Sequence, residues 1–134
     1  MLADCAAALR AVRAEPGDRL HHWDLHYGNV LAPLPGSGHG SWPAIDPRPL
    51  AGHPGFELLP ALRDRWDDAL ATGYLAGALR RRFDLLTEAL ELDREVAAVW
   101  TPARVLQDAA WAAEEGGTTL DPAQRAIADV LLGG

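Results

Sequence analysis

The sequence predicts a mainly α-helical domain with one small β-hairpin. Apolar residues recur at helical spacing along most of the chain beyond residue 54, which is typical of amphipathic helices. Two short apolar runs, at 30–31 and 42–45, enclose a connection rich in glycine, proline and serine, which is typical of a hairpin. With 134 residues and 49% hydrophobic content, the chain can bury one core but hardly two, so we expect a single domain over residues 1–134.

The first predicted element is a helix over residues 1–14, because its apolar residues from Leu2 to Val12 fall roughly on one face. The hairpin comes next. Its two arms run in opposite directions, so it would return the chain and bring Asp46 beside Asn29.

Helices account for the rest of the chain, over residues 54–132. Segment 54–70 carries apolar residues near helical spacing, with Pro60 either tolerated in an early turn or marking a break. Segment 74–92 is the clearest case, since its apolar side chains form one stripe and the three arginines at 80–82 lie mostly away from it.

Capping signals divide the last third of the chain. Asp93 is a predicted N-cap for a short helix that ends near residue 100. The Thr101-Pro102 pair is expected to start another helix, which the glycines at 116–117 end. The Asp121-Pro122 pair repeats the start signal for a last helix that ends near residue 132.

Two groups of side chains on these helices bear on function. The tryptophans lie among apolar neighbours, so we expect core packing for Trp66, Trp100 and Trp111. Six acids either meet the ammonium groups of a cationic substrate or form solvated helix faces, and these are Asp64, Asp67, Asp68, Asp108, Glu114 and Glu115.

The composition argues against several classes of protein. No stretch approaches the roughly twenty apolar residues of a membrane span, and no basic flank precedes an apolar run at the start, so we expect neither a membrane segment nor a secretory signal. A single cysteine, Cys5, cannot form an internal disulfide, and we expect a cytoplasmic protein. The net charge of -7 argues against a nucleic-acid partner, because phosphate backbones are bound by clustered Lys and Arg. That charge is compatible with a polycationic substrate and equally with an ordinary acidic protein.

The most informative pattern joins His22, Asp24, Asn29 and Asp46. Phosphoryl transfer to a hydroxyl needs a carboxylate beside the acceptor oxygen and oxygen ligands for the magnesium ions that neutralise the nucleotide phosphates. In the kinase catalytic loop, His-x-Asp is followed by four residues and Asn, and a second metal-binding Asp arrives later at a strand end. The spacing here fits, so the sequence predicts a kinase-like phosphotransferase centre.

Two longer segments narrow the family. Residues 22–31 run His-Trp-Asp-Leu-His-Tyr-Gly-Asn-Val-Leu, and residues 44–62 begin Ala-Ile-Asp-Pro-Arg-Pro-Leu-Ala-Gly-His-Pro-Gly-Phe-Glu. The sequence of these two segments resembles the aminoglycoside 6-phosphotransferase and hydroxyurea phosphotransferase family, to which streptomycin 6-kinases belong. The resemblance extends through residues 81–84 and 92–95 and so covers most of the chain. Commoner relatives have Gly where Trp23 stands and Lys where Arg48 stands.

The resemblance implies the helical, carboxy-terminal lobe of the protein-kinase-like fold and an enzyme that uses ATP and Mg²⁺. The catalytic loop would span 20–31 and the metal-binding segment 42–50. Asp24 would be the catalytic aspartate, and Asn29 and Asp46 would hold magnesium. The acceptor would be a hydroxyl group of an aminoglycoside-like small molecule.

Bracing residues form a second set. His22 and His26 are expected to brace the loop through hydrogen bonds, and the competing interpretation of these two with His21 is a zinc site, although no cysteine lies nearby. The resemblance places Glu57 at a helix start, where an acid accepts hydrogen bonds from the loop. A helix N-terminus also favours an acid without any further role.

A complete enzyme of this kind also carries an amino-terminal lobe with a strand lysine and a loop that covers the phosphates. No Gly-rich pattern precedes His22 and the chain has no lysine, so we expect this lobe to be missing, and it would be the natural packing partner. Two functions stay open: a phosphotransferase, truncated in this chain, or a non-catalytic remnant that binds small molecules. The sequence determines neither the acceptor nor the residues that bind it.

Overall fold

The structure is a computed structural model that describes residues 1–38 and 40–133. Its α-helices are α1 Leu2–Val12, α2 Leu58–Arg63, α3 Trp66–Ala71, α4 Leu75–Ala89, α5 Arg94–Glu114 and α6 Pro122–Leu132. Two 3-10 helices, η1 Tyr27–Asn29 and η2 Pro54–Glu57, and two strands, β1 Arg19–His21 and β2 Leu50–Gly52, complete the described elements. The predicted mainly helical fold with a small β element is therefore confirmed.

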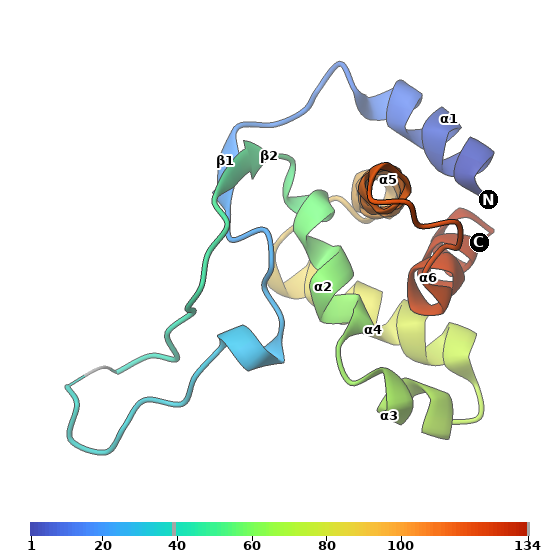
Figure 1. The fold of residues 1–134 in the computed structure, drawn as a ribbon. Helices are drawn as coiled ribbons and strands as arrows, with labels where there is room; N and C mark the ends of the chain where they lie inside the picture. The colour runs from blue at the N-terminus through green and yellow to red at the C-terminus, as the bar shows by residue number, and fades with distance from the viewer. Residues whose placement is uncertain (39, 134) are drawn as a thin grey trace.

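Helix α5 lies at the centre of the helical body, and α1, α6 and η2 pack against it (Figure 1). The largest fully buried side chains come from α2, α4, α5 and α6, and they include Phe83, Leu58, Leu59, Leu62, Leu79, Ile127 and Val105. Burial of each such side chain contributes about 1.5–3 kcal/mol. Helix η2 comes close to α5 because Gly55 has no side chain, since a Cβ there would lie 3.0 Å from Cα of Ala97.

Helix α5 corrects one prediction. Thr101-Pro102 does not begin a new helix, because α5 runs continuously from Arg94 to Glu114 with Pro102 inside it. An interior proline costs about 3 kcal/mol in an isolated helix. Here both residues are buried, and the Thr101 hydroxyl donates to the carbonyl of Gly55 at 2.8 Å. Tertiary packing therefore outweighs the local signal for a helix start.

The β structure also differs in place from the prediction. The sheet pairs β1 with β2 in antiparallel register, which joins residues on either side of the predicted hairpin. The predicted arms themselves meet at one bridge between Val30 and Ala44, and the Ile45 amide donates to the Asn29 carbonyl at 2.9 Å. Pro43 has no N–H to extend this ladder. Position 39 of the connection lies outside the described residues.

Most of the other helix predictions are confirmed. Helices α1, α4 and α6 fall within their predicted segments, and Asp93 and Asp121 cap α5 and α6 by accepting hydrogen bonds from backbone amides. Segment 54–70 divides into η2, α2 and α3. The break falls at Arg65, whose φ is 48°, while Pro60 sits within α2.

The three tryptophans have different environments. Trp100 is buried and Trp66 packs against the core, as predicted. The prediction is wrong for Trp111, which is 45% exposed and lies against the ring of Trp23. No helix in the part of the chain that the structure describes is long and apolar enough to cross a membrane.

Candidate functional site

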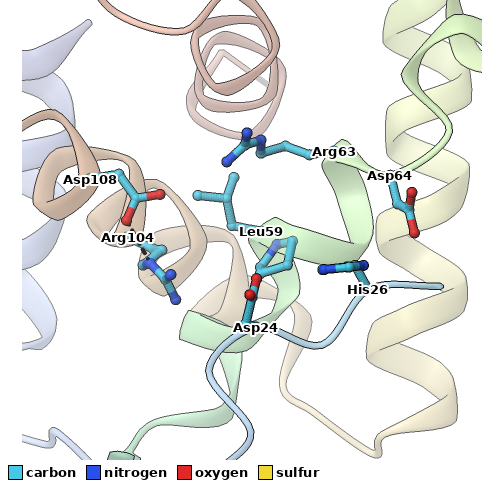
Figure 2. Close-up of a pocket in the computed structure, with 8 residues that line it drawn as sticks. Asp24, His26, Leu59, Arg63, Asp64, Arg104 and Asp108 are labelled. Carbon is cyan, nitrogen blue, oxygen red and sulfur yellow. Dashed lines mark hydrogen bonds and ion pairs between the residues drawn. The ribbon is translucent and has the colours of Figure 1, made fainter. Parts of the chain in front are cut away.

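Asp24 lies on the loop between β1 and η1, and it lines a cavity of about 350 Å³ (Figure 2). The loop contributes Asp24 and His26 to this cavity. The facing wall comes from α2 and its C-terminal end and from α5, and it consists of Leu59, Pro60, Arg63, Asp64, Arg104 and Asp108. The cavity therefore joins the predicted catalytic loop to helices that are distant in sequence.

The loop folds back on itself around Asn29. The Asn29 side chain is buried, and its Nδ2 donates to the Asp24 carbonyl at 2.9 Å. This bond uses the side-chain amide nitrogen of Asn29. Its Oδ1 stays available as a metal ligand, and magnesium prefers oxygen ligands. His26 adds a local bond, since its Nδ1 accepts from the Gly28 amide at 3.0 Å.

The residue before Asp24 has an unusual backbone. Trp23 has φ 72°, in the left-handed region, which costs on the order of 1–3 kcal/mol for a bulky residue. Its amide donates to Oε1 of Glu57 at 3.1 Å, and the other oxygen of Glu57 lies 3.0 Å from Nδ1 of His21. The opposite nitrogen of His21 lies 2.7 Å from the Gly52 carbonyl. Glu57 therefore connects the loop to η2.

Asp46 lies on the returning segment and is exposed, with φ 56°. Backbone contacts set its place. The Ile45 amide bonds to the Asn29 carbonyl, Nε2 of His22 lies 2.7 Å from the Ile45 carbonyl, and the Arg48 amide donates to the His22 carbonyl at 2.9 Å. The structure thus brings the Asp46 backbone next to the loop that carries Asn29.

The donor chemistry fits magnesium better than zinc. Mg²⁺ is usually held by one or two side-chain oxygens together with water and substrate phosphates, which matches the pair Asn29 and Asp46. Structural zinc needs four protein ligands. Within residues 1–38 and 40–133, no group of three or more His, Cys, Asp or Glu side chains is placed to hold a metal, so the zinc alternative finds no ligand set there.

The acids proposed for substrate contact lie in different environments. Asp64 accepts hydrogen bonds from the backbone amides of Tyr27 and Arg65, so its carboxylate is engaged in tying η1 to the end of α2. Asp108 pairs with Arg104, as described below. Asp67, Asp68 and Glu114 are exposed on helix surfaces, and Glu115 is exposed in the turn after α5.

Sequence reasoning missed three residues around the site. Arg104 is buried in the cavity wall, and Arg63 is an exposed cation at the same cavity. His53 caps η2 by accepting from the Gly55 amide at 3.0 Å and stacks on Trp100. Burial, with smaller contributions from nearby positive groups, lowers the pKa of His53. The only local signal among these is the four-residue spacing of Arg104 and Asp108, which is typical of a helical ion pair.

Comparison with known proteins assigns the chain to a family. The sequence model for "Aminoglycoside/hydroxyurea antibiotic resistance kinase" matches residues 1–116. The chain belongs to this family. The resemblance found in the sequence is therefore confirmed, and the matched residues include both Asp24 and Asp46.

Three relatives in this family are similar over almost the whole chain. Streptomycin 6-kinase of Streptomyces glaucescens and hydroxyurea phosphotransferase of Kitasatospora aureofaciens are each 54% identical over 133 residues, 99% of this chain, covering 42% and 36% of their own lengths. Streptomycin 6-kinase of Streptomyces griseus is 53% identical over 126 residues, 94% of this chain and 40% of the relative. The chain thus spans about two fifths of the length of these curated relatives. No solved structure matches it.

Proposed function

We propose that this chain forms the acceptor-binding and metal-binding lobe of an ATP-dependent phosphotransferase that acts on a hydroxyl group of an aminoglycoside-like or similar small molecule. One observation carries the proposal. Asp24 lines a cavity, Asn29 is hydrogen-bonded to the Asp24 backbone, and the segment that carries Asp46 is hydrogen-bonded to Asn29. These contacts support the proposal, because phosphoryl transfer requires one carboxylate base and oxygen ligands for magnesium close together.

Each residue then has a role. Asp24 orients the acceptor hydroxyl within the cavity and accepts its proton as the new bond to phosphorus forms. Asn29 and Asp46 would hold Mg²⁺, which supplies positive charge to the nucleotide phosphates when bound. His22, His26 and Glu57 brace the loop by the hydrogen bonds described above. Most of the acceleration comes from positioning and electrostatics.

The acceptor is the finer part of the proposal. The relatives named for streptomycin and for hydroxyurea are equally identical to this chain, so identity does not choose between a large polycation and a small neutral molecule. The cavity offers Asp24 together with the exposed cation Arg63. Both kinds of acceptor carry a hydroxyl that the carboxylate of Asp24 can receive as a hydrogen-bond donor.

A second candidate function is binding without transfer. Kinase-like sites pair a lysine with the nucleotide phosphates, and these 134 residues contain no lysine. A chain that relies on its own residues would then bind an acceptor in the cavity of Asp24 without transferring phosphate.

Calorimetric titration with Mg-ATP and, separately, with streptomycin and hydroxyurea distinguishes the two functions. It is followed by an assay for transfer of labelled phosphate. The proposed function predicts heat with Mg-ATP and an acceptor. In a chain that carries both lobes, it predicts transfer of phosphate and loss of that transfer in Asp24→Asn with binding retained. The matched control is Asp18→Asn, an exposed acid outside the cavity. Acceptor binding without nucleotide binding favours the binding module, and transfer retained by Asp24→Asn removes Asp24 from its role.

A further inference from the structure

Arg104 is a buried cation that the proposed mechanism does not use. It lies in the middle of α5 and is 7% exposed. A buried charge is tolerated only when it is paired and hydrogen-bonded. Its Nε donates to Oδ1 of Asp108 at 2.8 Å, and the other oxygen of Asp108 accepts from Nε2 of Gln124 at 2.7 Å. Helices α5 and α6 therefore fix the direction of the Arg104 side chain.

The far end of Arg104 reaches the loop. Its Nη1 donates to the carbonyl of Trp23 at 3.2 Å, and its Cζ lies 3.8 Å from the centroid of the Trp23 ring. That carbonyl belongs to the peptide group that joins Trp23 to Asp24. A guanidinium can bond in its plane and stack on an aromatic face at the same time, whereas an ammonium cannot combine these contacts.

The backbone of Trp23 is thus held on both sides of its Cα, at the peptide group before it and at the one that joins it to Asp24. Glu57 accepts from the Trp23 amide, and Arg104 donates to the Trp23 carbonyl. A left-handed backbone at a bulky residue persists only when its surroundings over-determine it. Arg104 also lines the cavity that Asp24 lines, so the residue that fixes the peptide stands beside the reacting position (Figure 2).

We infer that Arg104 is a positioning residue for Asp24: through the Trp23 carbonyl and ring it holds the Trp23–Asp24 peptide in the conformation that directs the Asp24 carboxylate into the cavity. This inference rests on the proposed function for its consequence in catalysis. Its geometric part concerns the loop alone.

Hydrogen exchange of individual amides, measured by NMR on the whole chain, tests the geometric part. In Arg104→Lys the charge beside Asp108 is kept, but the fork that also reaches Trp23 is lost. We expect exchange of the Trp23 amide to accelerate about tenfold, the effect of losing one charge-assisted hydrogen bond. Amides of Val105 and Ile127 in the core should stay within about twofold of wild type.

Two further variants keep the test decisive. Arg125→Lys is the matched control, because Arg125 also faces an Asp four residues later but is exposed on α6. If Arg104→Lys fails to fold, Arg104→Met with Asp108→Asn removes the buried charge and its half-buried partner while an amide remains for Gln124. An unchanged Trp23 amide, or equal acceleration throughout the core, overturns the inference, because Arg104 would then have no specific effect on the loop.

A kinetic measurement separates this inference from the proposed function. In a chain that carries both lobes and transfers phosphate, Arg104→Lys should lower kcat about tenfold and change both KM values less than about threefold, since a positioning residue acts on the reacting group rather than on binding. A tenfold rise in KM with kcat unchanged overturns the positioning role. Absence of transfer by a chain that carries both lobes counts against the proposed function, and the exchange result still decides the role of Arg104.

Discussion

The loop that carries Asp24 and the segment that carries Asp46 are held in different ways. Glu57 of η2 and Arg104 of α5 contact the loop, and Trp23 is 8% exposed. The segment from residue 41 to 51 is exposed at every position, and the chain between η1 and β2 extends away from the helical body (Figure 1). One half of the candidate site is built into the core, and the other half is attached to it by backbone hydrogen bonds.

Both halves contain a left-handed residue, which makes the contrast informative. Trp23 and Asp46 have φ values of 72° and 56°. Aspartate tolerates this conformation because its short polar side chain can bond locally, whereas tryptophan does not. Trp23 therefore depends on its neighbours to stay in place, and Asp46 does not. Packing therefore preorganises the loop of the proposed base Asp24, while the proposed metal ligand Asp46 keeps its backbone shape by residue type.

Removing the Glu57 carboxylate should destabilise the loop that carries Asp24. Glu57→Ala leaves the Trp23 amide and Nδ1 of the buried His21 ring without their partner, while Nε2 of His21 keeps the Gly52 carbonyl. Each unsatisfied buried group costs about 1–3 kcal/mol, so we expect a loss of about 3 kcal/mol in the free energy of unfolding, measured by urea denaturation. Glu57→Gln is the control, because its side-chain oxygen still accepts from Trp23 and its loss should be about half as large. Equal stability of all three proteins would show that Glu57 does not hold the loop.

Much of the fold was predictable because its signals are local. Periodicity identified α1 and α4, the Asp121-Pro122 start signal identified α6, and the caps at Asp93 and Asp121 follow from residue type. Two features depended on contacts across the chain. Pro102 stays inside α5 because its surroundings are buried, and β1 and β2 are three-residue strands too short to show alternation.

The site shows the same division. The spacing of Asp24 and Asn29 was readable, and the antiparallel return of the chain accounts for the place of Asp46. Arg104 was not predictable, because it meets Trp23 across 81 residues of sequence. A buried arginine in a helix looks like any other helical arginine until its environment is known.

Arg63 provides a test of charge on the wall of the cavity that the core supports. Arg63 is exposed, and within the described residues it has no ion pair. Under the proposed function, Arg63→Glu should tighten binding of a polycationic aminoglycoside about fivefold, because one repulsion becomes an attraction at a solvated site. Calorimetric titration with streptomycin measures this change. Hydroxyurea is the neutral control, and equal gains for both ligands would contradict an electrostatic origin.

His53 marks the junction where the exposed segment rejoins the helices. Burial lowers the pKa of this imidazole below its ordinary value of about 6.5, so the folded chain favours the neutral form. Its contribution to stability is therefore full above about pH 6.5 and falls as the pH drops toward the folded-state pKa. His53→Asn keeps a cap acceptor for Gly55 and does not titrate.

Urea denaturation at about pH 7.5 and about pH 5.5 checks this prediction. The difference in free energy of unfolding between the two pH values should be smaller in His53→Asn than in the wild-type chain. A variant with the same difference would place the acid sensitivity in other groups.

The smallest effect on stability is expected at Asp46. Asp46→Gly places the residue that best tolerates a positive φ at an exposed position, and the relief of strain offsets the greater freedom of the unfolded chain. We expect the free energy of unfolding to stay within about 0.5 kcal/mol of wild type. The same variant should lose the magnesium-dependent part of nucleotide binding, since it removes the carboxylate.

Trp23→Gly is the matched change in the other half of the site. It also relieves a positive φ, but it removes a buried ring that Arg104 and Phe56 contact, so it should destabilise the chain by about 2 kcal/mol or more. Equal effects of the two glycine substitutions would mean that packing does not distinguish the two halves of the site.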